Sequence, residues 1–208
     1  MPECHRETVA KQTEMVVWSI SETEADLAEG LSLSTKALDR LAQRKSSIHR
    51  KGYLAIRQLL KSLGIRPETH QYDPSGAPYL TDGRYISISH TQNIAAVVIS
   101  PIQVGIDIEY YQDKIIRIGP RFLHHSEITF PKTIDPIVYL TQIWTAKEAL
   151  YKLYKKPGIH FGKQLCIHPF QSDINTGTGE IFDDQKTTTC KLYFRKFENY
   201  CLTLATQK

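Results

Sequence analysis

The sequence contains few of the features that mark secreted, membrane-bound or zinc-binding proteins. Its four cysteines include no pair at the CxxC spacing of a zinc site. An even number of cysteines could form disulfides, but residues 1–14 are polar and contain no apolar signal-peptide core. No apolar run is long enough to span a bilayer. We therefore expect a cytoplasmic protein with reduced thiols and no membrane contact.

Long basic runs are also missing. Lys155–Lys156 and Arg44–Lys45 are short pairs without interleaved aromatic residues, so nucleic acid is not an expected partner. The formal net charge of +4 is mildly basic and suits an anionic partner. With 41% hydrophobic and 23% charged residues, the composition is that of a soluble globular protein, and 208 residues can form one large domain or two small ones.

Hydrophobic periodicity and turn residues outline the expected elements. Residues 47–63 repeat apolar side chains at helical spacing and are followed by Gly64, a typical residue at a helix C-terminus. Residues 114–118 predict a short helix interrupted at Gly119–Pro120, and residues 175–179 predict a turn. Strands are predicted at 15–20, 85–90, 94–100, 187–195 and 200–206.

Two acidic residues alternate with apolar ones in residues 104–109, VGIDIE. In a strand, Ile106 and Ile108 point to one face, and Asp107 and Glu109 point to the other, roughly 7 Å apart. Two carboxylates at that distance repel each other unless a cation lies between them, and a hard divalent ion such as Mg²⁺ prefers oxygen ligands. The same alternation also fits a solvated strand face, so the pattern alone leaves both interpretations open.

A helix with an apolar stripe is predicted around residues 144–152, WTAKEALYK. Glu148 and Lys152 are four residues apart and lie side by side at its flank, as in many surface pairs. Lys147 falls within the stripe itself. Its ammonium group either extends outward to water or points to an anion in a cleft.

Together, the GIDIE strand and the WTAKEALYK helix resemble the paired motifs of the 4′-phosphopantetheinyl transferase superfamily, and the chain length resembles its Sfp-type branch. This resemblance implies an enzyme that transfers the 4′-phosphopantetheine arm of coenzyme A to a serine of an apo acyl or peptidyl carrier protein. The second product is adenosine 3′,5′-bisphosphate.

The resemblance also implies an α+β fold with two similar, pseudo-duplicated halves and the active site in the cleft between them. We expect a flexible tail at residues 1–14, an N-terminal half at 15–103 and a C-terminal half at 104–208 that carries the metal site. Because the two halves already form a pseudo-dimer, a monomer is expected.

In the resembling family, Asp107, Glu109 and Glu148 correspond to the ligands of Mg²⁺. Glu148 is the first candidate for the base that deprotonates the carrier serine, and Glu127 or a metal-bound water is the second. Glu127 could instead stabilise a helix N-terminus. Lys152 would stabilise the leaving bisphosphate, and Lys147 would contact the pyrophosphate of coenzyme A.

Residues in the first half would bind the rest of coenzyme A. Ser89 and His90 end a strand in a motif similar to the SISHS motif of the family, where they would contact phosphate oxygens. Arg50 and Arg57 are two helical turns apart and share a face. In the resembling family, basic residues of the first half hold the 3′-phosphate of coenzyme A, so the resemblance implies that role for these two arginines.

The turn after residue 73 departs from the family pattern. Family members usually read G-K-P where this chain has Gly76, Ala77 and Pro78. Gly76 and Pro78 keep the turn that contacts coenzyme A, but the lysine contact is missing or is supplied by another base such as Arg84.

Two alternatives remain open. A different Mg²⁺-dependent phosphoryl enzyme, such as a nuclease or phosphatase, would also use clustered acids, although the sequence has no further cluster of Asp or His. A non-catalytic module of the same fold could bind coenzyme A or a carrier protein, and Ala77 favours that idea. The three acids and Lys152 argue against it, because a module that only binds has no need of repelling carboxylates.

Overall fold

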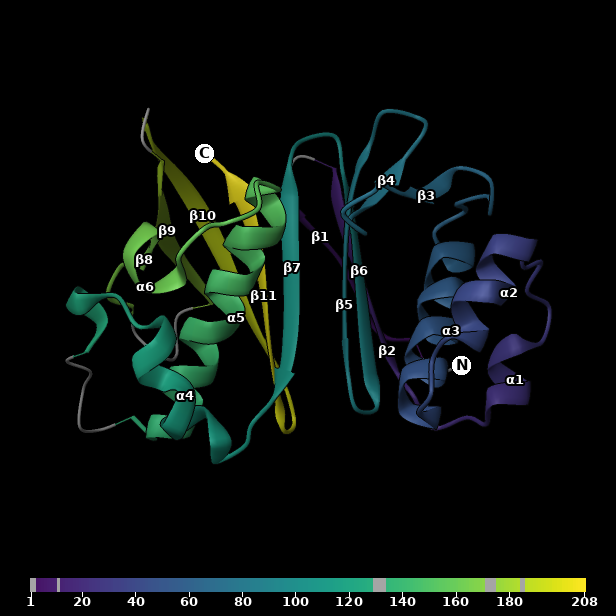
Figure 1. Ribbon diagram of the computed structural model, residues 1–208, viewed down its shortest axis with the longest axis horizontal. Coiled ribbons are helices and arrows are strands. Elements are labelled where there is room, and N and C mark those ends of the chain that lie inside the picture. Colours follow the sequence, from purple (N-terminus) through teal and green to yellow (C-terminus); the bar gives the residue numbers. More distant parts are fainter. Residues whose placement is uncertain (1–2, 11, 129–133, 171–174, 184–185) are drawn as a thin grey trace. The chain divides into compact units, whose positions relative to one another are not determined.

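The computed structural model describes residues 3–10, 12–128, 134–170, 175–183 and 186–208. The chain divides into two compact units, Met1–Pro101 and Ile102–Lys208. Each unit combines an antiparallel sheet with helices (Figure 1), so the expected α+β class is confirmed. None of the helices in these ranges combines the length and apolarity needed to cross a bilayer.

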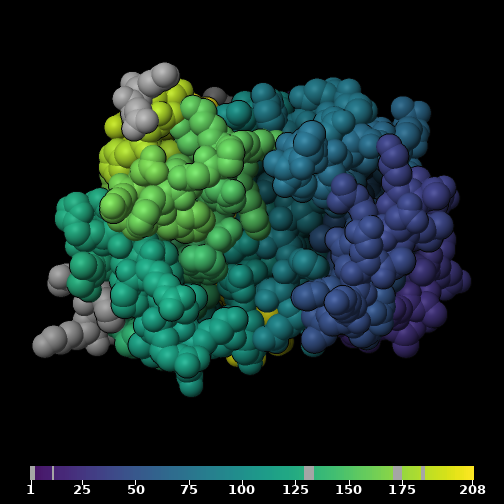
Figure 2. All heavy atoms as spheres, viewed as in Figure 1, coloured from purple at the N-terminus to yellow at the C-terminus, as the bar shows by residue number. Residues whose placement is uncertain are grey.

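The first unit has a four-stranded sheet in the order β1-β2-β6-β5, a short β3–β4 hairpin and three helices. Its elements are β1 (Glu3–Ala10), β2 (Thr13–Ser19), α1 (Glu24–Ala28), α2 (Thr35–Ala42), α3 (Ser47–Ser62), β3 (His70–Tyr72), β4 (Pro78–Leu80), β5 (Tyr85–Thr91) and β6 (Ile94–Ser100). Buried side chains of α3, such as Leu54 and Leu59, form one core with Val97 of β6. In the space-filling view, the blue-purple atoms of its helices form much of the visible surface of this unit (Figure 2).

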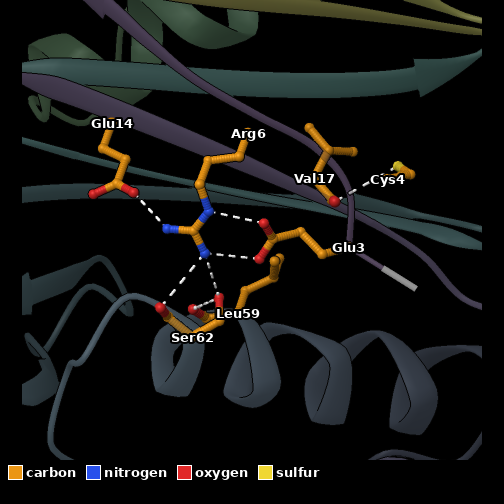
Figure 3. Close-up of polar contacts among 7 residues, drawn as sticks. All are labelled: Glu3, Cys4, Arg6, Glu14, Val17, Leu59 and Ser62. Carbon is orange, nitrogen blue, oxygen red and sulfur yellow. Dashed lines mark hydrogen bonds and ion pairs between the residues drawn. The ribbon is translucent and has the colours of Figure 1, made fainter. Parts of the chain in front are cut away.

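The polar N-terminal segment differs from expectation, because it forms β1 instead of a flexible tail. Arg6 donates from Nε and Nη2 to the Glu3 carboxylate at 2.8 and 2.7 Å, and from Nη1 to Glu14 of β2 (Figure 3). Its Nη2 also donates to Ser62 Oγ at the end of α3, at 3.1 Å. β1 pairs antiparallel with β2, and the contacts of Arg6 with Glu14 and Ser62, rather than an apolar face, join its side chains to the rest of the unit. Residues 1–2 and 11 lie outside the described ranges.

The second unit has a five-stranded sheet in the order β7-β11-β10-β9-β8. Its elements are β7 (Val104–Tyr110), α4 (Lys114–Phe122), the 3₁₀ turn η1 (His125–Glu127), α5 (Pro136–Tyr154), α6 (Phe161–Gln164), β8 (Leu165–Ile167), β9 (Thr176–Asp183), β10 (Lys186–Phe197) and β11 (Tyr200–Gln207). Helix α5 begins at the Asp135 cap, whose carboxylate accepts the Ile137 N–H. Ile143 and Leu150 of α5 are fully buried in the core of this unit.

Two local predictions in this unit were wrong. Helix α4 continues past Gly119–Pro120 to Phe122, because Phe122 is buried in the core near the helix end and only one helical N–H is lost at the proline. Residues 176–179 belong to strand β9 rather than a turn. A side chain at Gly179 would lie 3.0 Å from Leu150, so the glycine serves close packing and not a reversal of the chain.

The two units share one feature of connectivity. In the first, β2 precedes the helices and pairs antiparallel with the last strand, β6; in the second, β7 pairs antiparallel with the last strand, β11. The predicted duplication stays a prediction, which this connectivity supports.

Candidate active site

Gly105 sets the distance between strand β7 and helix α5 in the second unit. A Cβ atom at this position would lie 1.9 Å from the Ala149 carbonyl oxygen and 2.7 Å from the Leu153 nitrogen, both in the backbone of α5. Only glycine permits this close approach. Because side chains alternate along a strand, Asp107 and Glu109 lie on the same face as Gly105, which α5 covers.

The three predicted carboxylates influence one another across this contact. Asp107 is buried with 4% of its surface exposed, and Glu109 of β7 and Glu148 of α5 are half-buried. Burial, followed by repulsion from Asp107, raises the pKa of Glu148 to about 7, against the attraction of Lys152. Burial and repulsion from Asp107 also raise the pKa of Glu109, while a hydrogen bond from Trp144 opposes the shift.

Lys152 connects the helix to the strand. Its Nζ donates to Asp107 Oδ1 at 2.7 Å and to the Ile106 carbonyl oxygen at 3.1 Å. The Lys152 side chain is 28% exposed, so its ammonium group lies at the border between the acidic cluster and solvent. The structure thus brings together four of the predicted site residues: Asp107, Glu109, Glu148 and Lys152.

The donor chemistry of this cluster suits a hard cation, since it offers only carboxylate oxygens and two of the three groups have raised pKa values. A divalent ion would relieve the repulsion that raises them. However, within the described ranges no three His, Cys, Asp or Glu side chains are grouped so that they could hold a metal ion in the present arrangement. The role of these acids as Mg²⁺ ligands therefore stays a prediction.

Lys147 and Glu127 do not join the cluster. Lys147 is fully buried, and its Nζ lies 2.7 Å from the Glu127 carboxylate and donates to the carbonyl oxygens of Phe122, Phe161 and Leu165. Glu127 also accepts from backbone N–H groups, among them that of Ile167 at 2.7 Å. The predictions that Lys147 contacts pyrophosphate and that Glu127 acts as a base are therefore corrected, because both groups are occupied inside the core.

Arg50 is likewise engaged within its own unit. Its Nε and Nη2 donate to the Glu24 carboxylate at 2.8 and 3.0 Å, and its Nη1 donates to the carbonyl oxygens of Arg44 and Lys45. These hydrogen bonds connect α3 to α1 and to the loop before α3. All three guanidinium nitrogens are therefore engaged, and Arg50 does not present two adjacent N–H groups to a phosphate. Arg57 stacks on the Tyr53 ring at 4.0 Å and lines a cavity of the first unit.

The predicted Ser89–His90 pair lies in β5, where neighbouring side chains leave on opposite faces. Ser89 is buried and His90 is exposed. The His90 ring packs on Gly52 of α3, where a Cβ atom would lie 1.9 Å from its Cδ2. His90 is thus fixed against the N-terminal half of α3, and binding of a phosphate by both residues stays a prediction.

Gly76 has the positive φ of 87° that the predicted turn requires, and the Ala77 N–H donates to the Asp73 carboxylate at 2.9 Å. Pro78 begins β4 opposite Tyr72. The turn is therefore present, but none of these contacts tests whether Gly76 and Pro78 bind coenzyme A.

Sequence reasoning missed the roles of Gly105, Gly52 and Trp144. A glycine inside an apolar strand is a signal for close backbone approach and could have identified Gly105. Trp144 was assigned only to the apolar stripe, and no local pattern reveals that its indole would donate to Glu109.

Residues 103–205 match the family model of the 4′-phosphopantetheinyl transferase superfamily. The second unit, with its acidic cluster, therefore belongs to this superfamily, as the motifs implied.

Two curated relatives extend the likeness beyond this unit. The chain is 28% identical over 156 residues to the 4′-phosphopantetheinyl transferase gsp of Aneurinibacillus migulanus, covering 72% of this chain and 64% of the relative. It is 29% identical over 140 residues to enterobactin synthase component D of Salmonella typhimurium, covering 62% and 59%. The match thus spans less than two thirds of the length of either relative.

Proposed function

We propose that this protein transfers the 4′-phosphopantetheine moiety of coenzyme A to a serine of an apo acyl or peptidyl carrier protein. The observation that carries the proposal is the cluster of Asp107, Glu109, Glu148 and Lys152 within the residues that match the superfamily. The printed name of one relative, a 4′-phosphopantetheinyl transferase, supports the same reaction.

In this reaction the serine Oγ attacks the phosphorus that carries the pantetheine arm. A new P–O bond forms to serine, the pyrophosphate P–O bond breaks, and adenosine 3′,5′-bisphosphate leaves. The serine proton passes to a base. Glu148 is the best candidate, because it is a half-buried carboxylate of the cluster, and a carboxylate within hydrogen-bond reach of the serine can accept its proton.

Lys152 would stabilise the leaving bisphosphate. Its side chain is partly exposed, so the ammonium group can reach an anion at the edge of the cluster. Asp107, Glu109 and Glu148 would hold Mg²⁺. The ion, when bound, supplies positive charge that neutralises the pyrophosphate.

The test is to incubate the purified protein with coenzyme A, Mg²⁺ and an apo-carrier protein and to measure the mass of the carrier. We expect the carrier to gain the mass of the phosphopantetheine arm. Asp107→Ala and Glu148→Gln should each abolish this gain, and Lys152→Ala should slow it severely.

Glu180→Gln is the matched control, because Glu180 is a partly exposed carboxylate of the same unit that pairs with His168 outside the cluster. It should leave the rate unchanged. If no apo-carrier gains mass while coenzyme A still binds, the alternative of a non-catalytic binding module is favoured. A normal rate in Glu148→Gln would remove Glu148 from the chemistry.

A further inference from the structure

The turn η1 is attached to the rest of the second unit by hydrogen bonds that begin at an imidazole ring. Nδ1 of the half-buried His124 accepts the Ser126 N–H at 3.4 Å and lies 2.7 Å from Ser126 Oγ. The His124 N–H donates to Glu127 Oε2 at 2.7 Å. The other oxygen of this carboxylate accepts the Ile167 N–H of β8 at 2.7 Å, and the carboxylate pairs with Lys147 of α5. One short turn thus connects a histidine at the surface with β8 and α5.

Histidine is an unusual residue at the start of such a turn, because its Nδ1 accepts a hydrogen bond only while the ring is neutral. Helices usually begin at Ser, Thr, Asp or Asn, whose side-chain oxygens accept the N–H near neutral pH. Since a backbone N–H can only donate, the bond from Ser126 places the lone pair on Nδ1 and the ring proton on Nε2. A second ring proton would occupy Nδ1, and the Ser126 N–H would then face another donor.

The hydroxyl group of Ser126 does not remove this conflict. It lies 2.7 Å from Nδ1 and 3.4 Å from Sγ of Cys166 in β8, so it can donate to a neutral ring and turn to accept from a charged one. The Ser126 N–H cannot turn, because the backbone fixes its direction. Burial raises the pKa of the Cys166 thiol, so this group stays neutral and adds no charge beside the ring.

The surroundings of His124 also oppose a positive charge on its ring. The centre of the His125 ring lies 3.9 Å away, and that of Phe182 in β9 lies 6.2 Å away. Burial, followed by repulsion from His125, lowers the pKa of His124; Glu127 opposes this shift and Lys147 adds to it. The folded state therefore binds fewer protons than the unfolded state, so the stability that His124 contributes is complete above pH 6.5, its ordinary pKa, and is lost as the pH falls below it.

A second histidine of β8 responds to acid in the opposite sense. Nε2 of His168 lies 3.2 Å from the Glu180 carboxylate of β9. A proton on His168 would strengthen this contact, because it places a positive charge beside a carboxylate. Loosening of this region in acid would therefore be due to His124 and not to His168.

We propose that His124 is an acid-sensitive latch of the second unit. While its ring is neutral, it holds η1 in the conformation in which Glu127 binds β8 and neutralises Lys147. A proton on Nδ1 releases η1 and weakens the bond from Glu127 to the Ile167 N–H. Lys147 directly precedes Glu148, so the latch ends one residue from the acidic cluster. The inference does not rest on the proposed function, because neither coenzyme A nor a carrier protein takes part.

The test is amide hydrogen exchange of the full chain, measured by nuclear magnetic resonance at about pH 7.5 and about pH 5.5. Each exchange rate is divided into that of an unstructured chain at the same pH, which gives a protection factor. We expect the protection of the Ile167 N–H to fall about threefold or more at the lower pH. The Leu204 N–H in β11, a strand flanked by β7 and β10, reports global unfolding and should keep its protection within about twofold.

Three variants identify the group that takes up the proton. In His124→Asn the amide oxygen can accept the Ser126 N–H at both pH values, so the protection of Ile167 should change by less than about twofold. His125→Asn is the matched control, because it removes a neighbouring imidazole that is not the acceptor of this N–H; it should keep the fall, and so should His168→Gln. An equal fall in wild type and His124→Asn, or no fall in wild type, would overturn the proposal.

A second measurement on the wild-type protein does not depend on whether His124→Asn folds. The ¹⁵N spectrum of the imidazole rings reports which ring nitrogen carries the proton. At about pH 7.5 we expect the proton of His124 on Nε2 and the lone pair on Nδ1. A proton on Nδ1 at that pH would rule out the latch, because the Ser126 N–H would have no acceptor there to lose.

Discussion

Replacing Glu127 with glutamine removes the carboxylate that neutralises the buried ammonium group of Lys147. Both side chains are almost fully buried, and their charged atoms lie 2.7 Å apart. Burial lowers the pKa of Lys147, and attraction to Glu127 opposes that shift. In the Glu127→Gln variant the attraction to the carboxylate is lost while the burial remains, so the ammonium group becomes more costly in the folded state.

The magnitude follows from two limits. Breaking one side of a buried ion pair costs about 3–5 kcal/mol of unfolding free energy. The loss of unfolding free energy also has an upper limit, because Lys147 can release its proton and become neutral. Deprotonating an ordinary lysine at pH 7 costs about 5 kcal/mol, so the loss should not exceed that value. We therefore expect Glu127→Gln to lose about 3–5 kcal/mol at pH 7.

The pH dependence gives an independent check. With a folded-state pKa below that of the unfolded chain, Lys147 binds more protons in the unfolded state, so the stability of the variant rises with pH. The difference in unfolding free energy between wild type and the Glu127→Gln variant should therefore become smaller between about pH 7 and 10. Urea unfolding followed by circular dichroism measures both quantities. A loss below about 1 kcal/mol, or a difference that is constant with pH, would refute the reasoning.

Two further variants complete the experiment. In the double variant Glu127→Gln/Lys147→Met neither charge of this pair remains, so it should lose less stability than the sum of the two single variants. Asp82→Asn is the exposed control, because Asp82 pairs with Arg84 at a similar distance of 2.6 Å but at the surface. It should change stability by no more than about 1 kcal/mol.

Three other predictions concern the packing and charge of the two units. Gly105→Ala places a methyl group against the Ala149 carbonyl, so it should lower the unfolding free energy measured in urea by about 1–3 kcal/mol and should slow transfer. Unchanged stability would mean that α5 does not lie so close to β7. In the metal-free protein the folded-state pKa of Glu148 is about 7, above the ordinary value of 4.5. Between pH 4.5 and 7 the folded state therefore binds more protons than the unfolded state, so Glu148 lowers the stability of the fold as the pH rises through this range. Glu148→Gln should therefore raise the melting temperature more at about pH 8 than at about pH 5, and equal increases would contradict the assigned shift. Arg6→Ala should increase amide exchange in β1 but not in β6, since Arg6 connects β1 to Ser62; equal exchange in wild type and variant would count against that connection.

Elements with a clear period were predicted from the sequence. Helix α3 and strand β7 follow the helical and alternating patterns, and their ends carry ordinary signals such as Gly64. Strand β1 was missed because it has no continuous apolar face, and the local pattern cannot identify that Arg6 would contact Glu14 of β2 and Ser62 of α3.

The acidic cluster was predicted as a motif, but its surroundings were not. Asp107 and Glu148 could be paired because the family motifs are specific. Lys147 was recognised as unusual within an apolar stripe, yet its partner Glu127 lies twenty positions earlier in the chain, and only the tertiary structure brings the two together. The same holds for Arg50 and Glu24, whose contact crosses from α3 to α1.

In the proposed mechanism, Asp107, Glu109 and Glu148 together bind one divalent cation. The most direct measurement is titration of the metal-free protein with Mn²⁺, with free Mn²⁺ followed by electron paramagnetic resonance. We predict one saturable site that Mg²⁺ empties by competition and that weakens about tenfold or more in Asp107→Ala, Glu109→Gln and Glu148→Gln, but not in Glu180→Gln. Binding of the same strength in wild type and Glu148→Gln, or no binding at all, would contradict the claim.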